Sequence, residues 1–259
     1  MGIKIRISKS QLPLKYQSYS LIETTDGVSD SVYLMGDKYV LKVFENSDYN
    51  IESEKLLLNS IRQLRVTQLV ESFYIDASLT VVYKQIAGVS LYKPKDMHIK
   101  QIALFLKDFH NLSRSITSSN EMIFANSYLK DKIDIANNAE LKKHYNNLNI
   151  ELKNDGVIHG DLFCDNAKFV DDKLSGVFDF SEACRGDFLF DLAVVALSWC
   201  FDDNTPNHSK LNTLLENYEA TISIEQFYEY IKYALVYYAT MRFINKRDYK
   251  SLLKRLENL

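Results

Sequence analysis

The sequence contains little glycine, and this scarcity excludes two common phosphate-binding loops. Only eight of the 259 residues are glycine, at positions 2, 27, 36, 88, 156, 160, 176 and 186. Neither GxGxxG nor GxxxxGK(S/T) can be written from these positions. Both motifs need glycine so that the backbone can approach a phosphate closely. The chain therefore has neither a Rossmann-type nor a Walker-type phosphate loop.

Cysteine is also sparse, which argues against a disulfide or zinc framework. The three cysteines, Cys164, Cys184 and Cys200, form no CxxC pair. Such an odd, dispersed set predicts reduced thiols in a cytoplasmic protein. The first ten residues alternate Lys and Arg with Ile and contain no continuous apolar stretch, so we expect no secretory signal.

Long hydrophobic runs and a strongly basic charge are missing as well. The longest apolar stretch, Leu192 to Phe201, is interrupted by Ser198 and is shorter than the roughly 18 residues of a membrane span. It predicts a buried helix. The formal net charge is −3 and the pI is about 6.0, whereas nucleic-acid-binding domains are usually basic. We expect neither a membrane nor a nucleic acid as partner, and the sequence does not indicate an oligomeric state.

The first third of the chain is rich in strand-like segments. Asp26-Gly27 and Gly36-Asp37 mark turns between them, and one helix is expected over 51–64, where apolar residues recur at helical spacing. The expected strands are short runs of Val, Tyr, Leu and Thr, at 19–23, 31–35, 39–44 and 79–85.

Helical patterns dominate after Gly88. A β-hairpin is expected among these helices, with strands at 167–170 and 175–180 joined by Asp171-Asp172-Lys173. The order predicts an α+β fold with an N-terminal lobe at 1–86 and a C-terminal lobe at 87–259. The expected helices span 99–112, 128–153, 191–201, 210–218 and 224–245.

The segment from His159 to Asn166 carries the most informative pattern of polar residues. A loop presents the carboxylate of Asp161, and the amide of Asn166 follows five residues later. The hairpin then returns the chain so that Asp179 can lie beside the loop. Carboxylate and amide oxygens suit Mg²⁺, and phosphoryl transfer needs a metal on the phosphates and a group that orients the attacking hydroxyl. We predict that Asp161 accepts the hydroxyl proton and that Asn166 and Asp179 hold the metal; the alternative is that all three only shape turns.

A kinase also needs a cation on the nucleotide phosphates, and Lys42 in the strand-like run 39–44 is the candidate. On the following helix, Glu54 shares a face with Leu57 and Leu58 by its spacing. A carboxylate on an apolar face needs a partner, so we predict an ion pair between Glu54 and Lys42. Glu52 is the second choice, because it faces elsewhere.

Other polar residues near these segments are expected to be structural. His110 ends an apolar helix face, and His159 is expected to brace the loop. Asp191 either caps the helix that follows it or hydrogen-bonds back to the loop. Cys164 lacks the His and Asn partners of a nucleophile.

The residues from His159 to Asn166, followed by Gly176 to Phe180 and by Asp191-Leu192-Ala193, resemble the aminoglycoside phosphotransferase and choline kinase superfamily. The resemblance is dense from Val157 to Phe201 and patchy from about Gly27 to Val43. It implies a bilobal protein-kinase-like fold with a nucleotide-binding N-terminal lobe and a catalytic and substrate-binding C-terminal lobe. It also implies ATP and Mg²⁺ as cofactors and nucleotide contacts from Lys42, Glu54, Gly27 and Ser29.

Within the superfamily, Asp161-Leu162-Phe163 with Asp165-Asn166, and Ser198 to Phe201, are most similar to bacterial type II homoserine kinases. The expected acceptor is therefore a hydroxyl on a small molecule, with L-homoserine as the first choice. The sequence departs from those enzymes at Gly160, where they often have alanine, and at Ser181-Glu182, where an aromatic pair is expected; it is also shorter.

Acceptor contacts are expected just past Asp179 and near the C-terminus, from Glu182, Arg185, Asp187 and Arg242. An arginine would suit the carboxylate of homoserine, whereas the acidic residues leave an aminoglycoside or choline-type acceptor open. A pseudokinase-like nucleotide-binding module is a further alternative, although Lys42, Asp161, Asn166 and Asp179 are all present. The tyrosines of 224–245 are expected to pack in the core or to line part of the acceptor pocket.

Overall fold

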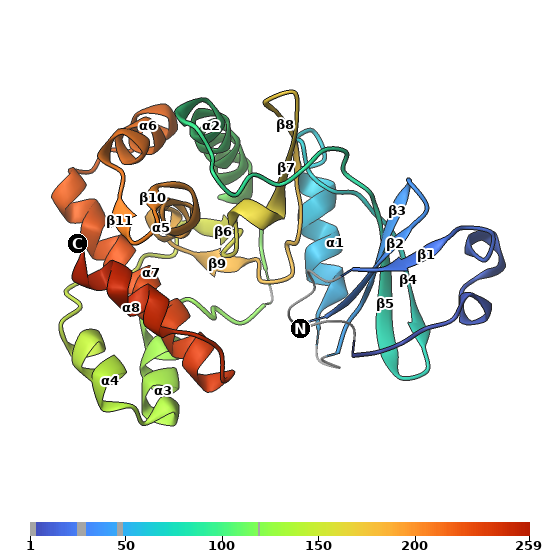
Figure 1. Cartoon of the computed structure of the whole chain (residues 1–259), viewed down its shortest axis with the longest axis horizontal. Helices are drawn as coiled ribbons and strands as arrows, with labels where there is room; N and C mark the ends of the chain where they lie inside the picture. The colour runs from blue at the N-terminus through green and yellow to red at the C-terminus, as the bar shows by residue number, and fades with distance from the viewer. Residues whose placement is uncertain (1–3, 25–29, 46–48, 119) are drawn as a thin grey trace. The chain divides into compact units, whose positions relative to one another are not determined.

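A five-stranded antiparallel sheet organises the first part of the chain (Figure 1). The computed structural model describes residues 4–24, 30–45, 49–118 and 120–259. The strand order is β1-β2-β3-β5-β4. The strands are β1 (Leu21–Glu23), β2 (Ser31–Met35), β3 (Tyr39–Val43), β4 (Leu69–Ile75) and β5 (Ser78–Lys84).

The period-two pattern of β2 explains how this sheet forms its core. Its residues alternate between buried and half-buried positions, as expected for a strand with one face in the core. Tyr33 and Met35 pack with Leu41, Val43 and Val82, and two short 3-10 turns, η1 (Lys9–Gln11) and η2 (Leu14–Tyr16), add Leu12 and Tyr16.

One helix, α1 (Ile51–Ser60), accompanies the sheet. Asn50 caps it by accepting a hydrogen bond of 3.3 Å from the Ser53 amide, which satisfies one of the free N–H groups at a helix start. Glu54, Leu57 and Leu58 are its buried residues. The helix ends at Ser60, four residues earlier than predicted.

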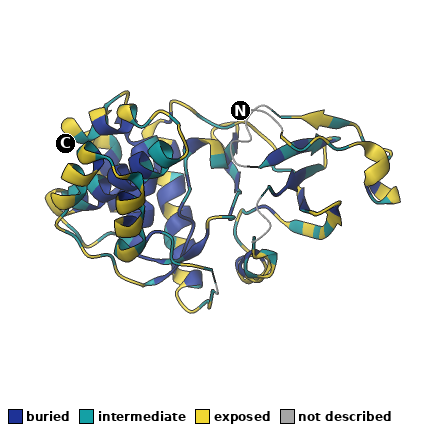
Figure 2. Cartoon of the chain, turned by 90° about the horizontal axis from the view of Figure 1, so that it is seen from below, coloured by how far each residue is buried: buried dark blue, intermediate teal, exposed yellow. Residues whose placement is uncertain are grey.

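The chain divides into two compact units, and the second is mainly helical. The first unit comprises the residues up to Arg62 with Val66–Ala87, and the second comprises Gln63–Arg65 with Gly88–Leu259. Buried residues fill the interior of the helical unit (Figure 2), where the almost wholly buried α5 packs against α7. Its helices are α2 (Asp96–Ser113), α3 (Asn126–Ala136), α4 (Ala139–Asn146), α5 (Phe188–Trp199), α6 (His208–Tyr218), α7 (Ile224–Ile244) and α8 (Lys250–Glu257).

Short two-stranded antiparallel pairs lie among these helices. The pair β7 (Ala167–Val170) and β8 (Lys173–Val177) is the hairpin that the sequence predicted, but its second strand spans 173–177 instead of 175–180, because Lys173 already pairs with Val170. Asp171 and Asp172 form its turn with positive φ values of 47° and 59°, a conformation that Asp tolerates better than most residues. The other pairs are β6 (Gly156–Ile158) with β9 (Cys184–Gly186), and β10 (Phe201–Asp202) with β11 (Thr205–Pro206).

The prediction of one helix over 128–153 was wrong. The segment forms α3 and α4, because Asn137 ends α3 in the left-handed conformation with φ 46° and Asn138 caps α4 by accepting from the amides of Glu140 and Leu141. Strand β4 and helix α8 were not predicted. Among the described residues, no helix is both long and apolar enough to cross a membrane.

Candidate active site

The loop between β6 and β7 brings Asp161 and Asn166 into direct contact. Asn166 ends the 3-10 turn η3 (Cys164–Asn166), which folds the loop back on itself. Its Nδ2 donates hydrogen bonds of 2.7 Å to the Asp161 carbonyl and 3.1 Å to the Asp161 carboxylate. Because the amide nitrogen faces Asp161, the amide oxygen of Asn166 is the atom that can face a cation.

The β7–β8 hairpin returns the chain so that Asp179 lies near this pair. The Phe178 amide donates to the Asn166 carbonyl at 3.0 Å, which ties the end of the hairpin to the loop. Asp179 has a positive φ of 63°, and its carboxylate accepts a hydrogen bond of 2.6 Å from Ser181. The charge of Asp179 acts on the Asp161 carboxyl, so the three residues that the sequence grouped lie near one another within the second unit; their roles in phosphoryl transfer stay predictions.

The electrostatics of Asp161 favour a cation at this place. Burial raises the pKa of the Asp161 carboxyl well above its usual range, and the charges of Asp179, Glu182 and Asp165 raise it further. The hydrogen bond from Asn166 opposes this shift only in part. A divalent ion beside Asp179 would offset the mutual repulsion of the carboxylates.

The oxygen donors here fit magnesium rather than a protein-enclosed transition metal. Asn166 and Asp179 offer one amide and one carboxylate oxygen, and Mg²⁺ usually completes such a set with water and substrate phosphates. Within the described part of the chain, no three His, Cys, Asp or Glu side chains cluster as a metal site. The residues thus fit a metal that arrives with a nucleotide, and their metal-binding role stays a prediction.

Asp191 holds the backbone of the loop from α5. Its buried carboxylate accepts hydrogen bonds of 2.8 Å from the amides of His159 and Gly160 and lies 3.0 Å from Nε2 of His110. Burial would raise the pKa of Asp191, but the hydrogen bond and charge of His110 outweigh it, so the pKa lies below its usual value. Of the two expected roles for Asp191, hydrogen bonding back to the loop is the observed one.

His159 joins the loop to the end of the hairpin, and its expected bracing role is confirmed. Its Nδ1 accepts from the Asp161 amide at 3.2 Å, and its Nε2 lies 3.1 Å from the Phe178 carbonyl. The carbonyl can only accept, so Nε2 carries the proton. Burial lowers the pKa of the His159 ring, which keeps it neutral in this arrangement.

Lys42 and Glu54 lie in the first unit, on β3 and α1. Both side chains are buried. The Lys42 ammonium lies 3.2 Å from the Asp30 carboxylate and 4.9 Å from the centre of the Phe44 ring. Asp30 is a neighbour of Lys42 that the sequence did not suggest, because the two residues are twelve positions apart and meet only when β2 pairs with β3.

The Glu54 carboxylate is oriented by two tyrosines. It accepts hydrogen bonds of 2.5 Å from Tyr49 and 2.8 Å from Tyr83. Glu52, the second choice, is largely exposed and lies 3.7 Å from Lys55 on its own helix. The buried position predicted for Glu54 is confirmed, and its ion pair with Lys42 stays a prediction. Gly27 and Ser29 lie outside the described residues.

The four residues expected at the acceptor occupy different surroundings. Glu182 is exposed, and its charge is among those that raise the pKa of Asp161. Asp187 is buried and caps α5, accepting bonds of 2.8 Å from the amides of Leu189 and Lys153. Arg242 lies in the last turn of α7, 3.5 Å from the Asp248 carbonyl.

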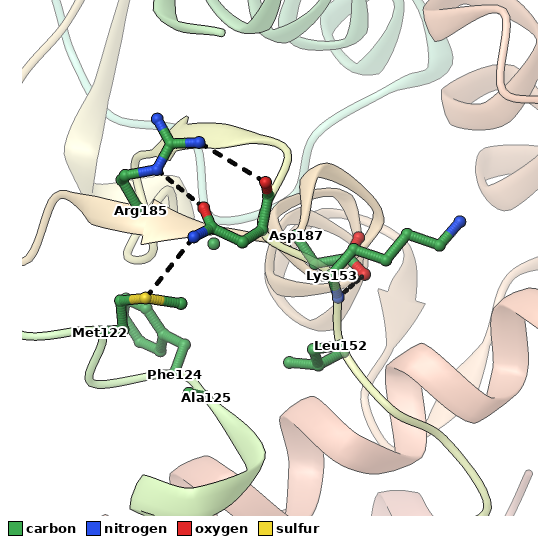
Figure 3. A pocket seen from close by; sticks show the side chains of 9 residues that line it. Met122, Phe124, Ala125, Leu152, Lys153, Arg185 and Asp187 are labelled. Atoms are coloured by element: carbon green, nitrogen blue, oxygen red, sulfur yellow. Dashed lines mark hydrogen bonds between the residues drawn. The ribbon is translucent and has the colours of Figure 1, made fainter. Parts of the chain in front are cut away.

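Arg185 borders a small pocket, shown in Figure 3, that Met122, Phe124 and Lys153 also line. Its guanidinium donates to the Asn154 side chain at 2.8 Å and to the Ile116 carbonyl at 3.1 Å. The bond to Ile116 ties the α2–α3 connection to β9, and the bond to Asn154 ties the segment between α4 and β6 to the same strand. The acceptor roles of Arg185 and the other three residues stay predictions.

Tyr238 on α7 is a neighbour of the loop that the sequence did not single out. Its hydroxyl donates a short hydrogen bond to the Gly160 carbonyl. The segment 224–245 is rich in tyrosine, so its pattern does not distinguish Tyr238 from tyrosines that pack in the core, such as Tyr233 and Tyr237.

The chain belongs to the phosphotransferase enzyme family (APH), whose model matches residues 20–220. The resemblance on which the sequence analysis relied is confirmed. The match spans both the sheet that carries Lys42 and the loop that carries Asp161.

Curated relatives share local similarity with the chain. Homoserine kinase of Azorhizobium caulinodans is 49% identical over 71 residues, which are 27% of this chain and 22% of the relative. Homoserine kinase of Sinorhizobium fredii is 34% identical over 152 residues, or 51% of this chain and 45% of the relative. The chain thus spans about a fifth to just under half of the length of these relatives.

Solved structures share the fold over nearly the whole chain. The GDP and kanamycin complex of APH(2")-IIia has a TM-score of 0.69 at 15% identity and covers 92% of this chain and 91% of its own. Choline kinase LicA from Streptococcus pneumoniae has a TM-score of 0.66 at 18% identity and covers 92% of both chains. These similarities confirm the predicted α+β, protein-kinase-like fold.

Proposed function

We propose that the chain is an ATP- and Mg²⁺-dependent kinase that phosphorylates a hydroxyl of a small molecule, with L-homoserine as the first acceptor to test. One observation supports the proposal above all: Asn166 donates a hydrogen bond to the Asp161 carboxylate, and the charge of Asp179 acts on the same carboxyl. Family membership supports the reaction class, and the homoserine kinases among the relatives support the acceptor.

The roles of the residues follow from the chemistry of phosphoryl transfer. Asp161 orients the acceptor hydroxyl and takes its proton as the oxygen bonds to the γ-phosphorus and ADP leaves. Asn166 and Asp179 would hold Mg²⁺, which neutralises phosphate charge when bound. Lys42 would contact the phosphates, with Glu54 as its predicted positioning partner.

His159 and Asp191 support Asp161 without touching a substrate. Asp191 fixes the two amides before Asp161, and His159 fixes the amide of Asp161 itself. Such bonds limit the movement of the carboxylate, and fixed geometry is a large part of catalysis in phosphoryl transfer.

An aminoglycoside or choline-type acceptor is the second candidate. The observation that favours it is the acidic character beside Asp161, where Glu182 and Asp165 are both exposed. Carboxylates would attract the cationic groups of such acceptors. Homoserine would need a cation for its carboxylate, for which Arg185 and Arg242 are the candidates.

A panel of acceptors with labelled ATP tests the proposal. L-Homoserine, choline, ethanolamine and kanamycin would each be incubated with ATP, with and without Mg²⁺. We expect Mg²⁺-dependent transfer to homoserine, and Asp161→Asn should lower kcat by about 10²- to 10⁴-fold, the usual contribution of a general base.

The matched control is Asp171→Asn, the same change at an exposed hairpin turn, where Asn tolerates the left-handed backbone. It should retain wild-type activity. Transfer to kanamycin or choline alone would replace homoserine as acceptor, and ATP binding without any transfer would favour a nucleotide-binding module.

A further inference from the structure

Gly160, the residue before Asp161, is held from three sides by different elements. Its amide donates to Asp191 of α5 at 2.8 Å, and its carbonyl accepts from Tyr238 of α7. Its φ of 74° lies in the left-handed region, and the Phe124 ring fills the space that a Cβ would need. Asp161 thus follows a residue whose two peptide planes are both fixed.

Tyr238 is itself held in place, so its hydroxyl has a defined direction. The ring meets Phe163 edge-on with 5.0 Å between centroids, and it meets Tyr237 edge-on at 5.1 Å. Edge-to-face contacts of this kind favour one ring orientation. Helix α7 therefore presents a hydroxyl to the loop at a fixed position.

The hydroxyl stays a donor at ordinary pH. Burial raises the pKa of Tyr238 well above its usual value, and the negative charge of Asp161 raises it further. The carbonyl of Gly160 can only accept. The bond therefore persists when Asp161 is ionised, which is the form that a general base needs.

The carbonyl that Tyr238 holds belongs to the peptide bond that joins Gly160 to Asp161. The amide of the same peptide donates to His159 Nδ1 at 3.2 Å. The peptide is thus bonded at its oxygen and at its nitrogen, and Asn166 fixes the carboxylate at the end of the side chain. Without the tyrosine hydroxyl, the peptide would lose the contact that resists its rotation on the carbonyl side.

We propose that Tyr238 is a positioning residue for Asp161 and acts through the Gly160 carbonyl. This inference rests on the proposed function, in which Asp161 is the general base. It separates Tyr238 from the other tyrosines of α7: Tyr233, for example, is fully buried and donates to the Phe124 carbonyl.

The test combines steady-state kinetics with amide hydrogen exchange on Tyr238→Phe. We expect kcat to fall by about 10- to 100-fold, because the Asp161 carboxylate would be misplaced. The KM values for ATP and for the acceptor should stay nearly unchanged. Exchange of the Asp161 amide, which belongs to the same peptide as the Gly160 carbonyl, should become faster. The control is Tyr228→Phe on the same helix, whose hydroxyl lies 3.2 Å from His208 on α6; it should leave kcat and exchange in the loop unchanged.

Unchanged kcat in Tyr238→Phe would overturn the inference. A lower kcat with equally raised KM values and a lower Tm would also overturn it, because a general loosening of α7 predicts that pattern. If the wild type transfers phosphate to no acceptor, the proposed function fails instead. Amide hydrogen exchange then decides alone. Faster exchange of the Asp161 amide in Tyr238→Phe supports a positioning role for the hydrogen bond from Tyr238 to Gly160, and unchanged exchange rejects that role.

Discussion

The carboxylate of Asp191 accepts a hydrogen bond of 2.8 Å from the backbone amide of Gly160. The same carboxylate accepts from the amide of His159, so a helix of the core fixes two consecutive residues of the loop. A fully buried carboxylate is stable only when its lone pairs are satisfied. Asp191 therefore links the stability of the fold to the geometry of the candidate active site.

Replacing this carboxylate by an amide should cost stability. In Asp191→Asn one amide N–H of the loop would face an NH₂ group instead of an oxygen, and the contact with His110 would lose its charge. We expect a loss of about 2–4 kcal/mol in the free energy of unfolding, typical of a broken buried charged network. Urea unfolding at pH 7 would measure it, with the exposed Asp108→Asn on α2 as control.

The pH dependence of this effect follows from the sign of the pKa shift. The pKa of Asp191 is lower in the folded state than its ordinary value, so ionised Asp191 stabilises the fold. The contribution is complete above the unfolded pKa of about 4 and is lost as the pH falls through the folded pKa. The difference between wild type and Asp191→Asn should shrink below about pH 4; a difference that grows there would contradict this assignment.

Lys42 should matter for the nucleotide in addition to its ion pair with Asp30. Methionine fills a similar volume in the buried position but carries no charge for the phosphates. We expect Lys42→Met to lower kcat/KM for ATP by about 100-fold, the scale of losing one charge-stabilising group. The control is Lys55→Met on α1, where the ammonium is exposed and lies 3.7 Å from Glu52. Equal kcat/KM values for ATP in the two variants would show that Lys42 does not contact the nucleotide.

Gly88, the first residue of the long segment of the second unit, has no room for a side chain. Its φ is 102°, and a Cβ there would clash with the carbonyl oxygen of Phe169 on β7, next to the bridge between Val89 and Phe169. We expect Gly88→Ala to destabilise the protein by about 1–3 kcal/mol through backbone strain. Urea unfolding would show this, whereas the exposed neighbour Ala87→Ser should unfold as the wild type does.

The three thiols should be unreactive in the folded protein. Cys164, Cys184 and Cys200 are buried, and burial raises the pKa of Cys164 to about 11 and that of Cys184 to about 12. Thiolate is the reactive form. A thiol reagent at pH 8 should therefore label the native protein slowly and all three cysteines in denaturant. Fast native labelling of Cys164 would contradict its buried position in the loop between β6 and β7.

The grouping of Asp161, Asn166 and Asp179 could be predicted because these residues are close in sequence. Asp161 and Asn166 lie in one loop. The polar turn at Asp171-Asp172 indicated the hairpin that brings Asp179 back toward this loop. Local spacing and turn chemistry decide such an arrangement. The same reasoning found the buried face of α1, since helical periodicity placed Glu54 beside Leu57 and Leu58.

Contacts between distant elements could not be predicted in this way. Tyr238 meets Gly160 only because α7 packs beside the loop, and nothing in the local pattern of 224–245 distinguishes it from its neighbours. Asp30 reaches Lys42 through the register of β2 and β3. The break between α3 and α4 did leave a signal, the pair Asn137-Asn138, because Asn is favoured both in left-handed turns and at helix starts.

The packing of Phe124 against Gly160 restricts how this protein can diverge. The ring lies where the first side-chain carbon of any other residue at position 160 would have to go. A homologue with alanine there would need a smaller or displaced side chain at position 124, so the two positions should covary. A side chain added at position 160 alone would clash with the Phe124 ring, whereas a simultaneous change at both positions would avoid the clash.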